Sequence, residues 1–208
     1  MFPNKHNTFI DEIIDFIVSV IGGTSLIFLI DILMNKVFVG KKTVLFGPQS
    51  SGKTTFLRYI YKGEIVEGRS GAPNHYEVKD AIYDVVTDFG GGEEWLPELF
   101  EKYIKEHHYI LFFFSVYEFI NDIAYRNDCF ARIDFIYNVI EKERSSNSEG
   151  QKKVLIIGTF IDKVPGFNSS MVENLFAGKP YAVLLQRSVY INTTQKECLK
   201  VINDALTN

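Results

Sequence analysis

The chain is poor in the residue types that build metal centres and disulfide frameworks. Its 208 residues include only two cysteines, Cys129 and Cys198, which lie far apart and outside any metal-ligand spacing. This usage suits a reducing compartment and argues against a disulfide framework. Of the four histidines, His107 and His108 are adjacent but have no third ligand near them in sequence, so no metal role is indicated.

Clustered positive charge is also missing. The net charge is −4, and no group of lysines and arginines is larger than a pair or two. The sequence therefore predicts no nucleic-acid partner. No repeat of 20–50 residues is visible either, and the length allows one full domain plus an appendage.

A long uncharged run of membrane-spanning length is likewise lacking. The uncharged run Phe16–Ile30 is shorter than the roughly 20 residues that a spanning helix needs. Extending it to Met34 takes in Asp31, and Gly22-Gly23 interrupts its middle, so insertion across a bilayer is marginal.

Two other structures compete for this segment. Isoleucines at helical spacing, with acidic residues on the other side, favour an amphipathic helix lying in a membrane interface. Alternatively, an apolar helix or helix pair docks on the domain or on a partner. We predict that residues 1–39 form such a helix or helix pair, with membrane contact through 10–39 as the favoured role. Lysines after the segment and acidic residues before it predict a cytoplasmic domain, at the cytoplasmic face of a membrane if the segment attaches.

From residue 40 to 208 the chain alternates strand-like and helix-like segments, which is typical of an α/β domain with a largely parallel sheet and helices on both faces. We expect six strands, of which one is antiparallel because 75–89 reads as two strands with a tight turn. The other strands are expected at 42–46, 109–116, 152–159 and 188–192. The helices are expected from Lys53, from about Glu93, and over about 129–144 and 194–206.

The first expected strand leads into Gly47-x-x-x-x-Gly52-Lys53-Thr54. Glycines let the backbone approach phosphates, and the following helix N-terminus favours an anion. Lys53 supplies a point charge to the β/γ-phosphates, and the Thr54 hydroxyl coordinates Mg²⁺. The predicted nucleotide-binding residues of this loop are Gly47, Pro48, Gln49, Ser50, Ser51, Gly52, Lys53, Thr54 and Thr55.

Asp88 ends another apolar strand, where a carboxylate can hold Mg²⁺ through water from across the site. A motor ATPase more often places an acidic residue directly after this aspartate. Here Phe89 and three glycines follow, which favours a switch.

The chain from about residue 40 onward resembles the Ras superfamily of small GTPases. It is most similar to the ADP-ribosylation-factor (Arf) branch and the beta subunit of the signal-recognition-particle receptor, in "VLFGPQSSGKTTFL" (44–57), "KGEIVEG" (62–68) and "DFGGG" (88–92). Bacterial and archaeal Ras-like proteins diverge from the family pattern in similar ways. The resemblance implies a Ras-like P-loop fold that binds GTP or GDP with Mg²⁺.

Several site residues follow only from this resemblance. Gly91 of Asp-x-x-Gly would bind the γ-phosphate through its backbone N–H, and Ser70 falls loosely where the family's Mg²⁺-binding switch threonine lies. The family's Asn-Lys-x-Asp corresponds to Thr159-Phe160-Ile161-Asp162, in which Asp162 would take the guanine N1 and N2 donors. Asp162 also suits a turn or an N-cap. Thr193 falls in the family's last base loop.

One departure concerns catalysis. The family's catalytic glutamine, which orients the attacking water, is replaced by Gly92. We therefore expect slow unassisted GTP hydrolysis, with Lys53 and either Glu93 or a partner's group in the catalytic roles.

The sequence thus predicts a GTP-binding switch whose effector or regulator reads residues 64–74 and 88–100. Two alternatives stay open: a pseudo-GTPase serving as a structural subunit, and a P-loop ATPase or kinase.

Overall fold

The computed structural model describes residues 41–62, 74–77, 83–88, 97–145 and 152–207. The chain divides into two units at Val39 and Gly40, and every described residue belongs to the second unit. The expected N-terminal helix or helix pair at 1–39 lies outside the described residues. Within the described ranges, no helix is both long and apolar enough to cross a membrane.

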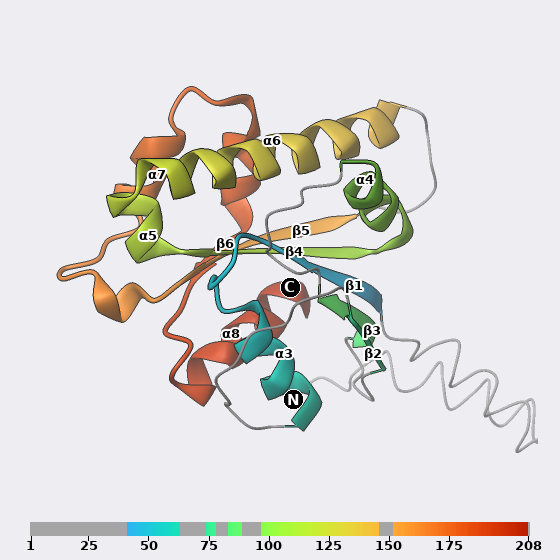
Figure 1. Cartoon of the computed structure of the whole chain (residues 1–208), viewed down its shortest axis with the longest axis horizontal. Coiled ribbons are helices and arrows are strands. Elements are labelled where there is room, and N and C mark those ends of the chain that lie inside the picture. The colour runs from blue at the N-terminus through green and yellow to red at the C-terminus, as the bar shows by residue number, and fades with distance from the viewer. Residues whose placement is uncertain (1–40, 63–73, 78–82, 89–96, 146–151, 208) are drawn as a thin grey trace, which may run out of the picture. The chain divides into compact units, whose positions relative to one another are not determined.

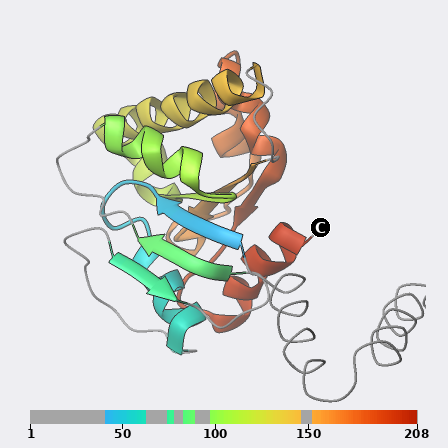
Figure 2. The same ribbon diagram turned by 90° about the vertical axis from the view of Figure 1, so that its right-hand side faces the viewer.

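The core of the unit is a sheet with the strand order β2-β3-β1-β4-β5-β6. β1 runs parallel to β3 and β4, β4 to β5, and β5 to β6, whereas β2 runs antiparallel to β3 (Figure 2). The strands are β1 (Lys41–Phe46), β2 (Asn74–Glu77), β3 (Tyr83–Asp88), β4 (Tyr109–Ser115), β5 (Lys153–Thr159) and β6 (Ser188–Tyr190).

Helices cover both faces of this sheet (Figure 1). The α-helices are α3 (Lys53–Lys62), α4 (Pro97–Glu106), α5 (Val116–Asn121), α6 (Ile123–Ser145), α7 (Ser170–Phe176) and α8 (Lys196–Thr207). Two 3₁₀-helices, η1 (Ile161–Lys163) and η2 (Pro180–Arg187), lie in the connection from β5 to β6. The predicted α/β class, with parallel strands and helices on both faces, is confirmed.

The central strands bury both of their faces, because successive side chains point to opposite sides of a strand. On β4, Ile110, Phe112 and Phe114 enter the first core, which α4, α5, α6 and α7 cover. Leu111 and Phe113 enter the second core, which α3 and α8 cover. This apolar run is fully buried, as its lack of alternation predicts.

Three parts of the chain differ from expectation, and one of them is α5, because no helix was expected between residues 116 and 128. The helix expected from about residue 129 begins at Ile123, because the Asp122 carboxylate accepts the N–H groups of Ala124 and Tyr125 at 2.7 and 3.1 Å and so caps it. The third difference is the stretch from residue 160 to 187, where no element was expected. It folds into η1, α7 and η2, which pack on α5 and α6 through residues such as Phe176 and Tyr181.

Candidate functional site

The connections of the sheet single out one edge, at the carboxyl ends of β1 and β4. These strands are neighbours, yet β1 leads into α3 on the second core and β4 leads into α5 on the first core. Adjacent strands that exit to opposite faces leave a crevice at their carboxyl ends, where α/β proteins bind ligands. The loop 47–52 lies at this point.

This loop has the backbone of an anion cradle. Gly47, Ser50 and Gly52 all have positive φ, at 139°, 61° and 90°. A Cβ on Gly47 would lie 2.0 Å from the backbone oxygen of Phe113 in β4, so only glycine fits beside that strand. Interspersed left-handed residues turn successive N–H groups toward one concave side.

The N–H groups of the loop are available to a ligand. Within the described part of the chain, no acceptor takes the backbone N–H of Gln49, Ser50 or Gly52, and residues 49–50 form a turn between Pro48 and Ser51. The N-terminus of α3 follows directly at Lys53. Unclaimed amides together with the positive end of a helix dipole form a ready site for phosphate groups.

Lys53 folds back over the same loop. Its side chain is only 5% exposed, and its Nζ donates to the carbonyl oxygens of Gly47 and Pro48 at 2.8 Å each and to Ser51 Oγ at 3.2 Å. A buried ammonium needs such oxygen partners. The three hydrogens of the ammonium thus go to oxygens of the loop itself, and these contacts hold the positive charge against the loop.

The structure brings Thr159 and Thr193 against Gly52. The methyl carbons of both threonines would lie 3.2 Å from a Cβ at Gly52. The fully buried Thr159 hydroxyl lies 3.0 Å from the carbonyl oxygens of Ser51 and Phe114 and donates its hydrogen to them. The loops after β1, β5 and β6 therefore meet around Gly52.

Two predicted Mg²⁺ ligands, Thr54 and Asp88, lie close in sequence to the carboxyl ends of β1 and β3. Asp88 is the last residue of β3 and is paired with Leu45 in β1, two residues before Gly47. Thr54 lies in the first turn of α3 and is partly buried. A hydroxyl and a carboxylate are the oxygen donors that Mg²⁺ takes alongside phosphates and water, so the residue types fit the ion. No cluster of three or more His, Cys, Asp or Glu with metal-site geometry occurs among the described residues.

The segment after β5 carries the expected base-recognition residues. Asp162 is exposed in η1. Phe160 adopts a left-handed conformation, with φ 56° and ψ 36°, and its ring lies 4.6 Å from Lys163 Nζ. In the loop after β6, Thr193 is buried, and Asn192 Oδ1 accepts the N–H of Thr194 at 2.9 Å.

Hydrogen bonds to α5 and α6 hold the last residue of β4, Ser115, in place. Tyr125 Oη accepts the Ser115 N–H at 2.8 Å, and Ser115 Oγ accepts the N–H of Glu118. Burial raises the pKa of Tyr125, so this phenol stays neutral. These bonds fix α5 at the carboxyl end of β4.

The remaining predicted residues cannot be placed. Ser70, Gly91 and Glu93 lie outside the described residues, as do Gly92 and most of the expected partner-reading segments. The Thr159 bridge and the left-handed conformation of Phe160 were not expected from the sequence. The threonine that ends an apolar strand is the only signal for the former, and no local signal predicts the latter.

No protein-family model matches the chain, and no curated protein matches it.

Proposed function

We propose that this chain is a guanine-nucleotide-binding switch of the Ras-like type, which takes Mg²⁺ with GTP or GDP. The observation that carries the proposal is the loop 47–53. The N–H groups of Gln49, Ser50 and Gly52 have no acceptor among the described residues, and Lys53 holds its positive charge against the loop. The loop lies at the carboxyl ends of β1 and β4, from which the chain continues to opposite faces of the sheet.

Two further features support a guanine nucleotide and a Ras-like arrangement. A strand order with one antiparallel strand, β2, beside β3 is the arrangement of Ras-like GTPases. Asp162 is exposed on the segment after β5, and the same segment touches the phosphate loop through Thr159. A carboxylate there can accept the N1 and N2 hydrogens of guanine, whereas adenine presents no such donor pair.

In this proposal each part of the site has one task. The amides of 49–52 and the Lys53 ammonium would bind phosphate oxygens, and Thr54 and Asp88 would hold Mg²⁺. Bound Mg²⁺ would neutralise phosphate charge. Because Gly92 cannot orient an attacking water, unassisted hydrolysis is slow, and Glu93 or a partner supplies the missing contact.

A second candidate is a nucleotide-binding subunit that does not turn GTP over. One observation favours it: Gly92 stands in place of the catalytic glutamine. Single-turnover GTP hydrolysis separates the two candidates. A slow rate that a partner accelerates supports the switch, whereas no turnover with or without partner supports the subunit.

Two further predictions from the sequence belong to this proposal, and they concern segments that lie wholly or mostly outside the described residues. An effector or regulator would read 64–74 and 88–100, and the segment 10–39 would attach the domain to the cytoplasmic face of a membrane or to a partner.

The test is a titration of the full-length chain with a fluorescent GDP analogue in Mg²⁺ buffer, with unlabelled GTP and ATP as competitors. We expect GTP to compete and ATP to fail. Lys53→Ala removes charge-assisted bonds to two phosphates, so affinity falls on the order of 100-fold. Lys200→Ala, at an exposed lysine on α8, is the matched control and leaves affinity unchanged. Unchanged affinity in Lys53→Ala, or equal competition by ATP, contradicts the proposal.

A further inference from the structure

The fold gathers basic residues that the sequence keeps apart. Lys41 and Lys42 begin β1, and Lys152 and Lys153 stand at the start of β5, far along the chain. β4 lies between these two strands, and His108 directly precedes it. Because β1, β4 and β5 run parallel, their amino ends meet at one edge of the sheet. We call these five residues the amino edge.

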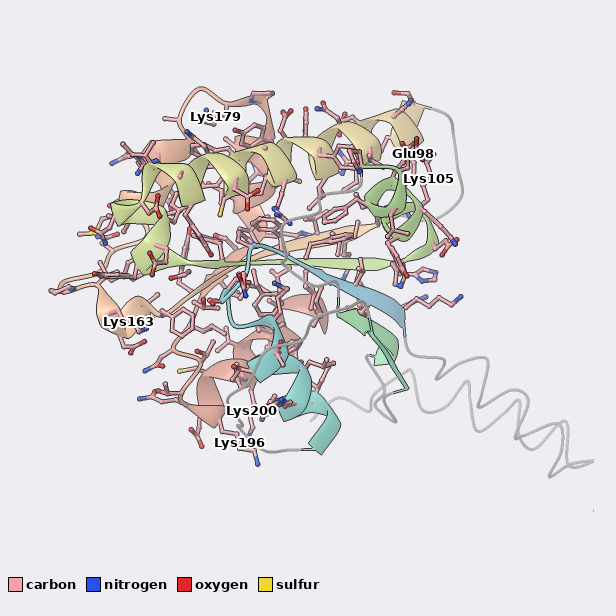
Figure 3. The ribbon with its side chains drawn as sticks, in the orientation of Figure 1. Glu98, Lys105, Lys163, Lys179, Lys196 and Lys200 are labelled. Atoms are coloured by element: carbon pink, nitrogen blue, oxygen red, sulfur yellow. The ribbon has the colours of Figure 1, made fainter. Side chains whose placement is uncertain are left out.

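Backbone hydrogen bonds hold the amino edge together. The His108 N–H donates to the Lys42 carbonyl oxygen at 2.9 Å, and the Lys153 N–H donates to the His108 carbonyl oxygen at 2.9 Å. Lys152 Nζ donates to the Lys105 carbonyl oxygen at 2.7 Å, which ties the end of α4 to the same edge. Figure 3 shows Lys105 at this end of the sheet. The proximity of these residues is therefore fixed by the fold itself.

Most of the positive charge at the amino edge is not neutralised within the described part of the chain. Lys152 Nζ lies 3.5 Å from the Glu143 carboxylate. Lys41, Lys42 and Lys153 form no ion pair with a described residue. The side chains of Lys41 and Lys42 are also exposed, so their charges are available to a partner.

The acidic residues of the neighbouring helix α4 do not cancel this charge. Glu101 pairs with Lys105 at 2.6 Å, and Glu106 lies 4.0 Å from Lys102. Burial, and after it the positive charges of three amino-edge lysines, lower the pKa of His108. The lysines therefore act together on one point, and the amino edge as a whole is positive.

The place of the amino edge in the chain indicates what it meets. Residues 10–39, for which the sequence predicts membrane contact, end directly before β1, because only Gly40 separates Val39 from Lys41. Anionic headgroups attract lysines that follow a membrane-contacting segment. The chain as a whole carries a net charge of −4, so a positive edge also turns the domain with this edge toward an anionic surface.

The amino edge and the candidate nucleotide site lie at opposite ends of β1. The strand runs from Lys41 to Phe46, and the loop 47–52 follows it. At a rise of about 3.3 Å per residue, the two ends of the strand are about 17 Å apart. A surface that contacts the amino edge therefore leaves the phosphate loop open to solvent.

We propose that the amino edge is a docking surface for anionic lipid headgroups, which hold the domain at a membrane together with the segment 10–39. This inference rests on the membrane attachment in the proposed function and names the lipid chemistry that the attachment selects. It does not depend on the nucleotide site.

The experiment titrates the full-length chain with two kinds of vesicle, one of phosphatidylcholine alone and one that also contains phosphatidylserine. Bound protein is measured by sedimentation. The variant Lys41→Gln/Lys42→Gln removes two exposed charges and keeps the backbone bonds of both residues, because those use main-chain oxygens. A short DNA duplex is the third ligand, and GDP affinity is measured for every variant.

The matched control is Lys196→Gln/Lys200→Gln, which removes the same charge from α8. Both lysines are exposed, and Figure 3 shows them on this helix. Lys196 begins α8, whereas the last turn of the helix approaches the amino edge, where Lys153 Nζ donates to the Leu206 carbonyl oxygen at 2.9 Å. The control thus changes net charge away from the proposed surface.

We expect wild type to bind the phosphatidylserine vesicles more tightly than the neutral ones. Lys41→Gln/Lys42→Gln weakens binding to the anionic vesicles about 30-fold, because each lysine near an anionic surface contributes about fivefold. Its binding to neutral vesicles, its GDP affinity and all values of the control variant stay at wild-type levels. An ionic strength of about 1 M shortens the screening length to roughly 3 Å and removes the difference between the vesicles.

The results that overturn the inference differ in what else they overturn. Equal wild-type affinity for the two vesicles, or equal losses in the two double variants, removes the amino edge as a lipid surface. DNA binding as tight as vesicle binding, and weakened by Lys41→Gln/Lys42→Gln, assigns the edge to nucleic acid instead. If wild type binds neither vesicle, the membrane attachment fails as well, whereas an intact GDP affinity leaves the nucleotide site standing.

Discussion

At the residue scale, Thr159 links the end of β5 to the loop 47–52 of the proposed site. Its hydroxyl is fully buried and lies within 3.0 Å of the Ser51 carbonyl oxygen in the phosphate loop and of Phe114 in β4. One hydroxyl has one hydrogen, so the two carbonyls share it. Ser51 is thereby fixed in the conformation that leaves the loop amides facing outward.

Thr159→Val keeps the shape of the side chain and removes the donor. Burying two carbonyl groups that have lost this partner should cost about 1–3 kcal/mol of unfolding free energy. Nucleotide affinity should also fall, by roughly 10-fold for each 1.4 kcal/mol by which the competent loop conformation is disfavoured. Urea unfolding and the GDP titration measure the two effects.

Thr43→Val is the control for this change. Thr43 is equally buried, and its hydroxyl donates to the Lys41 carbonyl at 2.9 Å at the opposite end of β1. This variant should lose stability and keep wild-type affinity. If Thr159→Val behaves in the same way, the hydroxyl supports the fold alone and does not position the loop.

At the element scale, a stack of side chains links β1, α4 and α6. Phe46 at the end of β1 stacks on Phe100 of α4 with ring centroids 4.5 Å apart. The Arg132 guanidinium of α6 lies 5.9 Å from the Phe100 ring and is 5% exposed. Its Nε donates to both carboxylate oxygens of Asp128, one turn earlier, at 2.9 and 3.0 Å. The pair lets α6 bury a cation against α4.

Asp128→Ala removes the carboxylate from this buried guanidinium. We expect a loss of about 1–3 kcal/mol, because the buried guanidinium loses its charge-assisted hydrogen bonds from Nε to a carboxylate that is itself partly exposed. Glu141→Ala on the same helix breaks the exposed pair with Arg144, and it should cost no more than about 0.5 kcal/mol. Urea unfolding of both variants is the measurement, and equal costs would show that Arg132 does not depend on Asp128.

Elements that depend on the local sequence pattern could be predicted, whereas elements that depend on tertiary packing could not. The strands 109–115 and 153–159 follow from their apolar runs, and the loop from Gly47 to Lys53 follows from its glycines. The start of α6 was missed because Asp122 caps it in a polar stretch that has no helical period. The elements between 160 and 187 depend on tertiary packing against α6, which no short window of sequence contains.

The same limit applies to the candidate site. Residue types at fixed spacing could be read directly, and these include Lys53 and Thr54. Contacts between distant loops could not be read, such as Thr159 with Ser51, because they arise only when the parallel strands bring their carboxyl ends together. Phe160 was visible as a departure from the family motif, but its left-handed backbone was not.

At the scale of the whole molecule, the proposed site follows from the layout of the sheet. Two separate cores lie on opposite faces of the same strands, and the neighbouring strands β1 and β4 lead to opposite faces, β1 to α3 and β4 to α5. The phosphate loop, the segment after β5 and the loop after β6 all belong to that edge. A ligand that bridges them binds only the folded state and stabilises it by mass action.

The central claim is that this edge holds a guanine nucleotide. The most direct measurement is to purify the full-length chain without added nucleotide, denature it, and identify and quantify what is released by mass spectrometry. The account predicts GDP or GTP approaching one per chain, and none from Lys53→Ala purified in the same way. An adenine nucleotide, or an empty protein that fails to take up GDP with Mg²⁺, would contradict it.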